Sequence, residues 1–361
     1  MIEIFTYRLP FSKPFVTGSG VFHHREGLLI RYSDDSTEVI SEAAPLPGFS
    51  TESLEEVKTT VTDQKESLDI FFSQSYSLEE LKTFLQQFPK LPSLQFALSF
   101  LGIQILSERS QRSLFDLFEV KYQPKVLVND VLPIQDVEET IHHFKKSYDS
   151  GFRTFKIKSG YPVDQLVKTL KALSQTAGQD CRFRVDANQS WPADQFSEIT
   201  EQLGEFNIEY IEEPCHNSDI QTLANFNQKS TIPIALDESI KNIDHLKVVL
   251  KKLPETIIVI KPTVLGNLFD LFETLARHRT HFNRIVVTTA LESSVGRKAV
   301  TSVASLIGDP TMAHGLNTGR FFKTDLSNEN LISNGKLKLP ESGFCSTKIE
   351  DLNNSYYQVV D

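Results

Sequence analysis

The sequence predicts an α/β protein built as a (β/α)8-type barrel with an α+β capping domain. From about residue 125, short runs rich in β-branched and apolar residues alternate with longer amphipathic segments, as in parallel βα units. About eight such units are present, which is the number that closes a barrel. The alternation is missing from residues 1–90, and 361 residues suffice for a barrel and a second, smaller domain.

The capping domain is expected to span residues 1–95. Residues 26–44 read as an antiparallel pair of strands that turns at residues 34–36, "DDS". Two amphipathic stretches, residues 51–72 and 77–88, are typical of helices. Together these segments indicate a small α+β domain that precedes the barrel.

The helix ends in this region carry recognisable signals. Thr51 and Ser77 open the two helical stretches, are followed by acidic residues, and are the expected N-caps. Residues 92–108 read as a buried helix that leads into the barrel. After about residue 325 the chain returns to short strands and turns, and we expect residues 325–361 to complete the capping domain.

The barrel domain is expected to span residues 96–324 with seven or eight βα units. Amphipathic segments such as residues 164–177 and 243–253 separate its strands. The strand candidates, in chain order, are residues 125–130, 154–158, 183–188, 208–214, 232–238, 256–262 and 284–289, with a weaker eighth at residues 311–319.

Composition and charge exclude several classes of partner. The formal net charge is −10, which argues against nucleic acid or an anionic membrane surface. Cys181, Cys215 and Cys345 are scattered, with neither metal-ligand spacing nor a disulfide pattern. No signal peptide or membrane-length apolar run is visible, so a cytoplasmic protein with a small-molecule substrate is expected. Both a monomer and a homo-oligomer remain open.

Five consecutive strand candidates each carry one charged residue at or just beyond their carboxyl end. They are Lys158, Asp186, Glu212, Asp237 and Lys261, spaced by about one βα unit. Because barrel enzymes place their active sites at the carboxyl ends of the strands, these five side chains are expected to meet there.

The order of these charges indicates a metal-assisted reaction. Three converging carboxylates repel one another unless a cation lies between them, and Asp186, Glu212 and Asp237 are the expected ligands of Mg²⁺, with Mn²⁺ as an alternative. Lys158 and Lys261 would then face each other across a bound carboxylate substrate. This arrangement suits abstraction of a proton next to the carboxylate, with formation of an enediolate.

Other residues are expected to act on the main base, Lys158. Lys156 alternates onto the same face of the strand "FKIK", and its positive charge is expected to lower the pKa of Lys158. Arg184 stands two residues before Asp186, faces the same way, and would add to this field. Lys156 is therefore included with the catalytic residues Lys158 and Lys261.

At these residues the chain resembles the enolase superfamily, in particular its muconate-lactonising subgroup. The resemblance rests on "KIK", "VDANQSW", "IEEP", "LDES" and "IKPTVLG" in this order across residues 150–300. It implies the superfamily's modified TIM barrel with a capping domain, and a lysine base that works with Mg²⁺. Within the subgroup, residues 41–56 and 288–297 are similar to segments of the o-succinylbenzoate synthase family, although that family often has Gly-Glu where this chain has Ser41-Glu42.

The resemblance implies a hydro-lyase of menaquinone biosynthesis. Lys158 would take the α-proton of 2-succinyl-6-hydroxy-2,4-cyclohexadiene-1-carboxylate and return it to the leaving hydroxyl, while a protonated Lys261 stabilises the enediolate. N-acylamino-acid racemases, dipeptide epimerases and muconate cycloisomerases would use the same residues. Family epimerases commonly carry Asp-x-Asp on strand eight, and "HGLNTG" lacks it. A catalytically silent barrel would have lost one of the five charged residues, and a Schiff-base aldolase would leave the carboxylates without a role.

Further residues are candidates for substrate binding or for support of the site. Asn188 would reach a metal-bound water or shape a loop, and Glu238 would touch the site. Ser293 and Ser294 would bind a substrate carboxylate or cap the following helix. Ser19 and Gly20 belong to a glycine-rich segment that would close over the substrate or form an ordinary hairpin turn.

Overall fold

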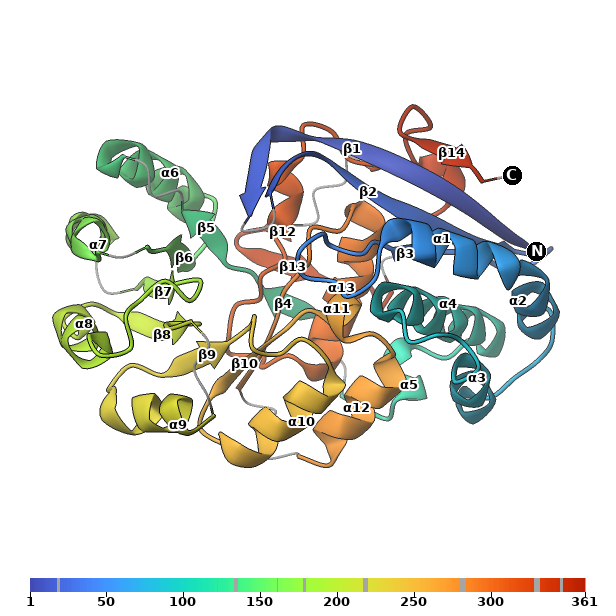
Figure 1. The fold of residues 1–361 in the computed structure, drawn as a ribbon. Coiled ribbons are helices and arrows are strands. Elements are labelled where there is room, and N and C mark those ends of the chain that lie inside the picture. Colours follow the sequence, from blue (N-terminus) through green and yellow to red (C-terminus); the bar gives the residue numbers. More distant parts are fainter. Residues whose placement is uncertain are drawn as a thin grey trace.

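The computed structural model describes residues 1–17, 20–121, 123–132, 136–160, 162–177, 180–216, 220–278, 284–327, 332–344 and 347–360. An antiparallel sheet with helices α1 to α4 lies beside a ring of parallel strands and outer helices (Figure 1). The predicted fold class, a barrel with an α+β cap, is confirmed.

The capping sheet has the order β14-β1-β2-β3 and is antiparallel. Its strands are β1 (Ile2–Thr17), β2 (Gly20–Ser33), β3 (Glu38–Ala43) and β14 (Tyr357–Val359). The predicted turn between β2 and β3 is confirmed, since Asp34 Oδ1 accepts hydrogen bonds from the backbone N–H groups of Ser36 and Thr37. The C-terminal strand β14 pairs with β1, so both ends of the chain meet in one sheet.

The cap helices are α1 (Leu54–Asp63), α2 (Lys65–Phe72), α3 (Leu78–Leu85) and α4 (Pro92–Ser110). Ser77 caps α3, as predicted. The prediction of Thr51 as an N-cap is wrong, because α1 begins after Ser53. Ser53 forms a capping box with Glu56, whereas Thr51 is followed three residues later by leucine and has no such partner.

The parallel sheet of the barrel has the order β11-β10-β9-β8-β7-β6-β5, with neighbours parallel throughout. Its strands are β5 (Asp130–Leu132), β6 (Thr154–Lys158), β7 (Arg182–Asp186), β8 (Ile208–Glu212), β9 (Ile234–Leu236), β10 (Ile257–Ile260) and β11 (Ile285–Val287). The helices after the cap are α5 (Leu114–Leu117), α6 (Val137–Asp149), α7 (Asp164–Ala177), α8 (Phe196–Leu203), α9 (Ile220–Lys229), α10 (Ile243–Lys252), α11 (Pro262–Leu265), α12 (Leu268–Ala276) and α13 (Ser294–Ile307).

Two strand predictions need correction where the barrel closes. Residues 125–130 do not form one strand: β4 (Lys125–Leu127) pairs with β13 (Lys336–Lys338), which also pairs with β12 (Ile332–Ser333). The predicted eighth strand is reduced to parallel bridges, Val128 with His314 and Thr288 with Gly315. These bridges join the first and seventh units and close the ring.

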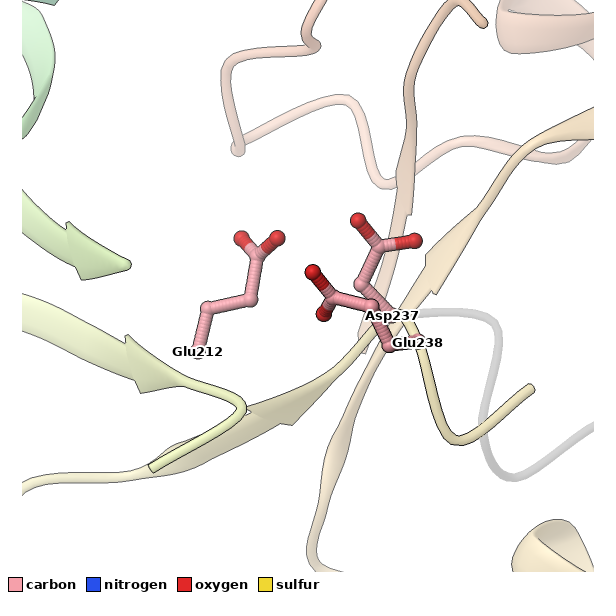
Figure 2. Close-up of side chains that lie close together, drawn as sticks. All are labelled: Glu212, Asp237 and Glu238. Carbon is pink, nitrogen blue, oxygen red and sulfur yellow. The ribbon is translucent and has the colours of Figure 1, made fainter. Parts of the chain in front are cut away.

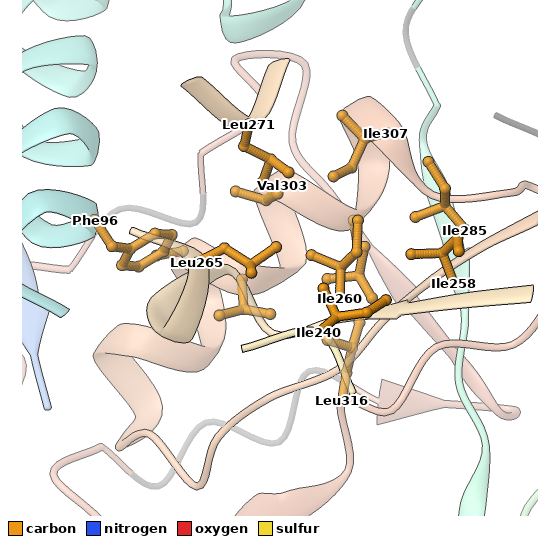
Figure 3. Packing of buried hydrophobic residues seen from close by; sticks show 14 of the residues in the cluster. Phe96, Ile240, Ile258, Ile260, Leu265, Leu271, Ile285, Val303, Ile307 and Leu316 are labelled. Atoms are coloured by element: carbon orange, nitrogen blue, oxygen red, sulfur yellow. The ribbon is translucent and has the colours of Figure 1, made fainter. Parts of the chain in front are cut away.

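One hydrophobic cluster extends from the cap into the barrel. Figure 3 shows Phe96 of α4 close to Leu265, with Ile258, Ile260 and Ile285 of the barrel strands beyond. All five side chains are buried. Helix α4 therefore contributes to the same core as the strands, and the cap is held against the barrel largely by burial of apolar surface. In the described part of the chain, no helix is both long and apolar enough to cross a bilayer.

His314 makes the closure of the barrel sensitive to pH. Its Nδ1 accepts a hydrogen bond of 3.0 Å from the backbone N–H of Val287, and burial lowers its pKa to about 3. The unfolded state binds a proton below about pH 6.5, which is the ordinary pKa of histidine, whereas the folded state excludes it. His314 therefore destabilises the folded state progressively as the pH falls from about 6.5 toward 3.

We expect this contribution to lower the folding equilibrium constant by about tenfold per pH unit in that range. Urea denaturation of the wild type and of His314→Asn at pH 7, 6 and 5 would measure it. The slope of the free energy of unfolding against pH is compared between the two proteins, rather than its absolute value. This separates the effect of proton uptake from the effect of lost packing. Equal slopes in the two proteins would contradict the assignment.

Candidate active site

A cavity of about 460 Å³ lies over the carboxyl ends of the barrel strands. The cap covers one side of it with Phe15, Leu46 and Phe49. The barrel contributes all five residues of the predicted charged set and Lys156, namely Lys156, Lys158, Asp186, Glu212, Asp237 and Lys261. The structure thus brings these six side chains together from five successive units of the barrel.

Lys156 lies between two of the carboxylates. Its Nζ is 2.8 Å from Asp186 Oδ2 and 2.7 Å from Glu212 Oε1. Burial lowers the pKa of Lys156, but the two carboxylates outweigh this effect and raise it well above the ordinary value. Lys156 is therefore a cation compensated by two carboxylates, and its expected action on Lys158 stays a prediction.

Lys261 follows β10 and forms an ion pair with Asp237, which follows β9. Its ammonium also lies 5.1 Å from the centre of the Phe49 ring, a cation–π contact supplied by the cap. Burial opposes the charge of Lys261, but Asp237 and Glu238 outweigh it and raise its pKa. Lys261 is therefore held as a cation at the top of the barrel.

Lys158 ends β6 and approaches the cavity from the side away from Lys261. Its Nζ donates a hydrogen bond of 3.1 Å to Asn188 Oδ1. The Asn188 amide in turn donates to Glu238 Oε1 at 2.8 Å, and its backbone N–H donates to Asp186. Asn188 and Glu238 both line the cavity, and Asn188 connects Lys158 to the acidic residues.

The acidic residues fit a divalent cation. Glu212, Asp237 and Glu238 each offer an oxygen within 4.8 Å of the others, and Figure 2 shows Glu212 facing the pair that follows β9. Among the described residues, Glu212 Oε2 and Glu238 Oε2 are buried without a hydrogen-bond partner. Burial raises the pKa of Glu212 to about 8 despite Lys156, so this carboxyl lacks sufficient positive charge nearby. A hard cation with oxygen ligands would supply it.

The compact group differs in one member from the predicted ligand set. Glu238 lies within it and Asp186 does not, although Lys156 contacts both Asp186 and the member Glu212. The assignment of Asp186, Glu212 and Asp237 as ligands stays a prediction.

Glu213 supports the turn that carries Asp237 and Glu238. Its Oε1 accepts hydrogen bonds from the backbone N–H groups of Asp237 and Ser239, at 2.9 and 2.7 Å. Its Oε2 accepts from the Ser239 hydroxyl and from Gln189. Glu213 has a φ of 43°, which turns its side chain away from that of Glu212. One acid of "IEEP" therefore faces the cavity and the other braces the neighbouring turn.

Of three supporting residues, Ser293 confirms one of its two predicted roles, that of a helix cap, whereas the expectations for Arg184 and Ser294 need correction. Arg184 is fully buried inside the barrel, where it pairs with Glu209, and it does not line the cavity. Ser293 caps α13 and donates to Glu42, and Ser294 is bonded to the segment at Asp325. Neither serine lines the cavity, because the helix start points both of them toward other elements.

Of the glycine-rich segment, Ser19 lies outside the described residues. Gly20 begins β2, is exposed, and is absent from the described lining of the cavity.

The sequence motifs include residues 288–297 but name no site residue among residues 288–291, and the structure places this turn along the cavity after β11. The cap holds this turn with two buried charged residues. Arg25 donates to the carbonyl groups of Ala44 and Leu291 at 2.6 and 3.0 Å. Glu42 accepts from the backbone N–H groups of Ser293 and Gly296 at 2.9 and 2.8 Å. Arg25 and Glu42 stand among other charged residues of β2 and β3, so the sequence gives no signal that sets them apart.

The fold and this set of side chains define an enzyme of the enolase class. Residues 139–344 match the family described as "Enolase C-terminal domain-like", and residues 1–104 match "MenC, N-terminal domain". The chain therefore belongs to the enolase superfamily, as the sequence motifs suggested.

Named relatives carry out more than one reaction. The o-succinylbenzoate synthase of Aliivibrio fischeri is 28% identical over 90% of this chain and 92% of its own. The N-succinyl-L-Arg/Lys racemase of Bacillus cereus is 24% identical over 85% of this chain and 82% of its own. Among solved structures, o-succinylbenzoate synthase from Thermosynechococcus elongatus, complexed with Mg, has a TM-score of 0.72 and 24% identity, covering 90% of this chain and 94% of its own. That likeness supports the fold.

Glu212, Asp237 and Glu238 together are called the acidic group. We expect Mg²⁺ to stabilise the folded protein by binding to this group. Above the dissociation constant, each tenfold rise in free Mg²⁺ should add about 1.4 kcal/mol to the free energy of unfolding, and so raise Tm. Glu212→Gln and Asp237→Asn should remove most of this effect. Differential scanning calorimetry with and without a chelator would measure it. The exposed Glu255→Gln serves as control, and retention of the full Mg²⁺ effect by both site variants would contradict the assignment.

We expect Glu42→Ala to lower the free energy of unfolding by about 2–4 kcal/mol, because it leaves buried donors at the start of α13 without an acceptor. Glu26→Ala on the same sheet removes an exposed ion pair with Arg8 and should cost less than about 1 kcal/mol. Urea denaturation would compare the two variants. Glu42→Gln, which keeps one acceptor oxygen, should lie between them, and an unchanged midpoint for Glu42→Ala would contradict the role of Glu42.

Proposed function

We propose that this enzyme is an o-succinylbenzoate synthase of menaquinone biosynthesis. It would dehydrate 2-succinyl-6-hydroxy-2,4-cyclohexadiene-1-carboxylate to 2-succinylbenzoate in the cytoplasm, with Mg²⁺ as cofactor. The observation that carries the proposal is the placement of Lys158 and Lys261. They come from β6 and from the end of β10, with β7, β8 and β9 between them, and reach one cavity from two sides of the acidic group.

This placement suits removal of a proton next to a carboxylate. Lys158, in its neutral form, takes the α-proton, and the electron pair of the broken C–H bond enters the substrate carboxylate to give an enediolate. Lys261 remains protonated and stabilises the added negative charge from the other side. When bound, a divalent cation supplies Lewis-acid stabilisation of the same charge.

The second half of the reaction uses the same lysine. Lys158, now an ammonium, gives its proton to the leaving hydroxyl, and the electron pair of the enediolate forms the new ring double bond as water departs. Removal of the proton and departure of the hydroxyl occur on one face, so a single lysine serves both steps. The result is a syn elimination that makes the ring aromatic.

The cavity and the relatives favour this reaction over the alternatives. All acids among the described lining residues lie around the acidic group, whereas the eighth-strand segment contributes Gly315, Asn317 and Thr318. A dipeptide ammonium group would therefore have no free carboxylate on that side. Several named relatives, at 25–28% identity, are o-succinylbenzoate synthases. N-succinylamino-acid racemisation is the second candidate, since a racemase relative spans most of the chain.

We expect Lys158→Ala and Lys261→Ala each to lower kcat for the cyclohexadiene substrate by about 10²-fold or more, since a proton-transfer group contributes about 10²–10⁴ and one charge-stabilising donor about 10²–10³. Ultraviolet progress curves would record aromatisation, and chelation should abolish it in the wild type. Lys252→Ala, at the exposed end of α10, is the control.

Absence of turnover by the wild type would overturn the proposed reaction. Exchange of the α-proton of N-succinyl amino acids with deuterated solvent would then establish the racemase alternative. Turnover that survives in Lys158→Ala would instead contradict the role given to Lys158.

A further inference from the structure

A second cavity adjoins the catalytic one on the side of Lys158. Its volume is about 1130 Å³, and it lies between the end of β1, strand β5 and helix α6, where Figure 1 shows the β1–β2 ribbon reaching toward β5. The two cavities adjoin and share part of their lining: Phe15, Val131, Lys158, Asn188, Asn317 and Phe321. A substrate held by the acidic group can therefore extend past Lys158 into this space, which we call the side cavity.

The side cavity is positively charged in a protein whose net charge is −10. Besides Lys158, it is lined by Lys13, Lys146 and Arg320, against the single acid Asp130. Lys13 and Lys146 are exposed and form no ion pair with any residue that the structure describes. Their charge is therefore available to an anion that enters the cavity.

The one acid of the side cavity is already engaged. Asp130 is buried, and its carboxylate accepts hydrogen bonds from Ser147 at 2.5 Å and from Asn317 at 3.0 Å. It also pairs with Arg320 at 2.6 Å, while His143 lies 3.0 Å away. Asp130 therefore neutralises Arg320 and repels an incoming anion little.

Arg320 is held in position by its surroundings. It contacts Asp130 and the backbone carbonyl of Val131, and it packs against the Phe321 ring at 5.1 Å. These contacts fix the wall of the side cavity beside Asn317, while Lys13 and Lys146 supply flexible charges opposite. Ser150, Ser159 and Ser190 also line the side cavity, and their hydroxyls already donate to backbone carbonyls. Lys13 and Lys146 are therefore the groups of this lining that suit a carboxylate.

We propose that the side cavity binds a second carboxylate of the substrate, with Lys13 and Lys146 as the residues that select for it. This inference rests on the proposed function, whose substrate carries one carboxylate on the ring and another at the end of the succinyl tail. The ring carboxylate belongs with the acidic group, next to the proton that Lys158 removes. The tail then passes Lys158, and its carboxylate reaches the lysines of the side cavity.

The test compares adjacent lysines of α6. Lys146 lines the side cavity, whereas Lys145 is equally exposed and does not line it. We expect Lys146→Gln and Lys13→Gln each to raise KM for the dicarboxylate substrate by about threefold to tenfold, with kcat nearly unchanged, as for loss of one partly solvated charge pair. Lys145→Gln should leave KM unchanged. With the methyl ester of the tail carboxylate as substrate, all three variants should match the wild type.

The binding step can be measured apart from turnover. Calorimetric titration with 2-succinylbenzoate and with its tail methyl ester should show the same selective loss in Lys146→Gln and Lys13→Gln. Wild-type turnover combined with unchanged KM in both variants would overturn the side-cavity proposal and leave the proposed function standing. If the wild type turns over neither the diacid nor the ester, the proposed function fails, and unchanged titrations in the variants would then overturn the side-cavity site as well.

Discussion

The organisation of this molecule depends on one electrostatic constraint, the convergence of carboxylates at the mouth of the barrel. Parallel strands deliver Asp186, Glu212, Asp237 and Glu238 to one cavity. Two lysines offset part of this charge, Lys156 from within the ring and Lys261 from its far side. The unpaired oxygens of Glu212 and Glu238 show that the compensation is incomplete. A site that needs one more cation is suited to hold a divalent metal.

The cap completes this site and also fixes its far wall. Its apolar residues Phe15, Leu46 and Phe49 line one side of the cavity, and the Phe49 ring contacts Lys261. Its two buried charges, Arg25 and Glu42, hold the carbonyl and amide groups of the turn after β11. The shared core around Phe96 makes cap and barrel a single packed body. The walls that contact a substrate are therefore set by contacts between the two parts.

Acidic residues predominate in the lining of the catalytic cavity and basic residues in the lining of the side cavity. Negative groups gather below the cap at the ends of β8 and β9, and positive groups gather beyond Lys158, beside β5 and α6. The relatives bear the names of more than one reaction, a synthase and a racemase among them. Proton abstraction by Lys158 would serve either reaction, so selectivity under the proposed function has to come from the remaining walls of the cavity. The positively charged lining of the side cavity is the part of these walls whose chemistry differs most from that of the acidic group.

The sequence by itself determined the barrel and the set of side chains at its mouth. The strand period of two and the βα spacing are local properties, so charged residues at successive strand ends necessarily share one end of a parallel sheet. The cap of α3 was equally predictable, because Ser77 and Glu80 interact within one helical turn.

Only the tertiary structure decided how those side chains are paired. The engagement of Lys156 by two carboxylates, the burial of Arg184 against Glu209, and the bond from the Ser293 hydroxyl to Glu42 all depend on partners distant in the chain. The reduction of the eighth strand to two bridges depends likewise on how the ring closes. Such contacts form between elements whose relative positions follow from packing of the whole core, and no local pattern of residues encodes them.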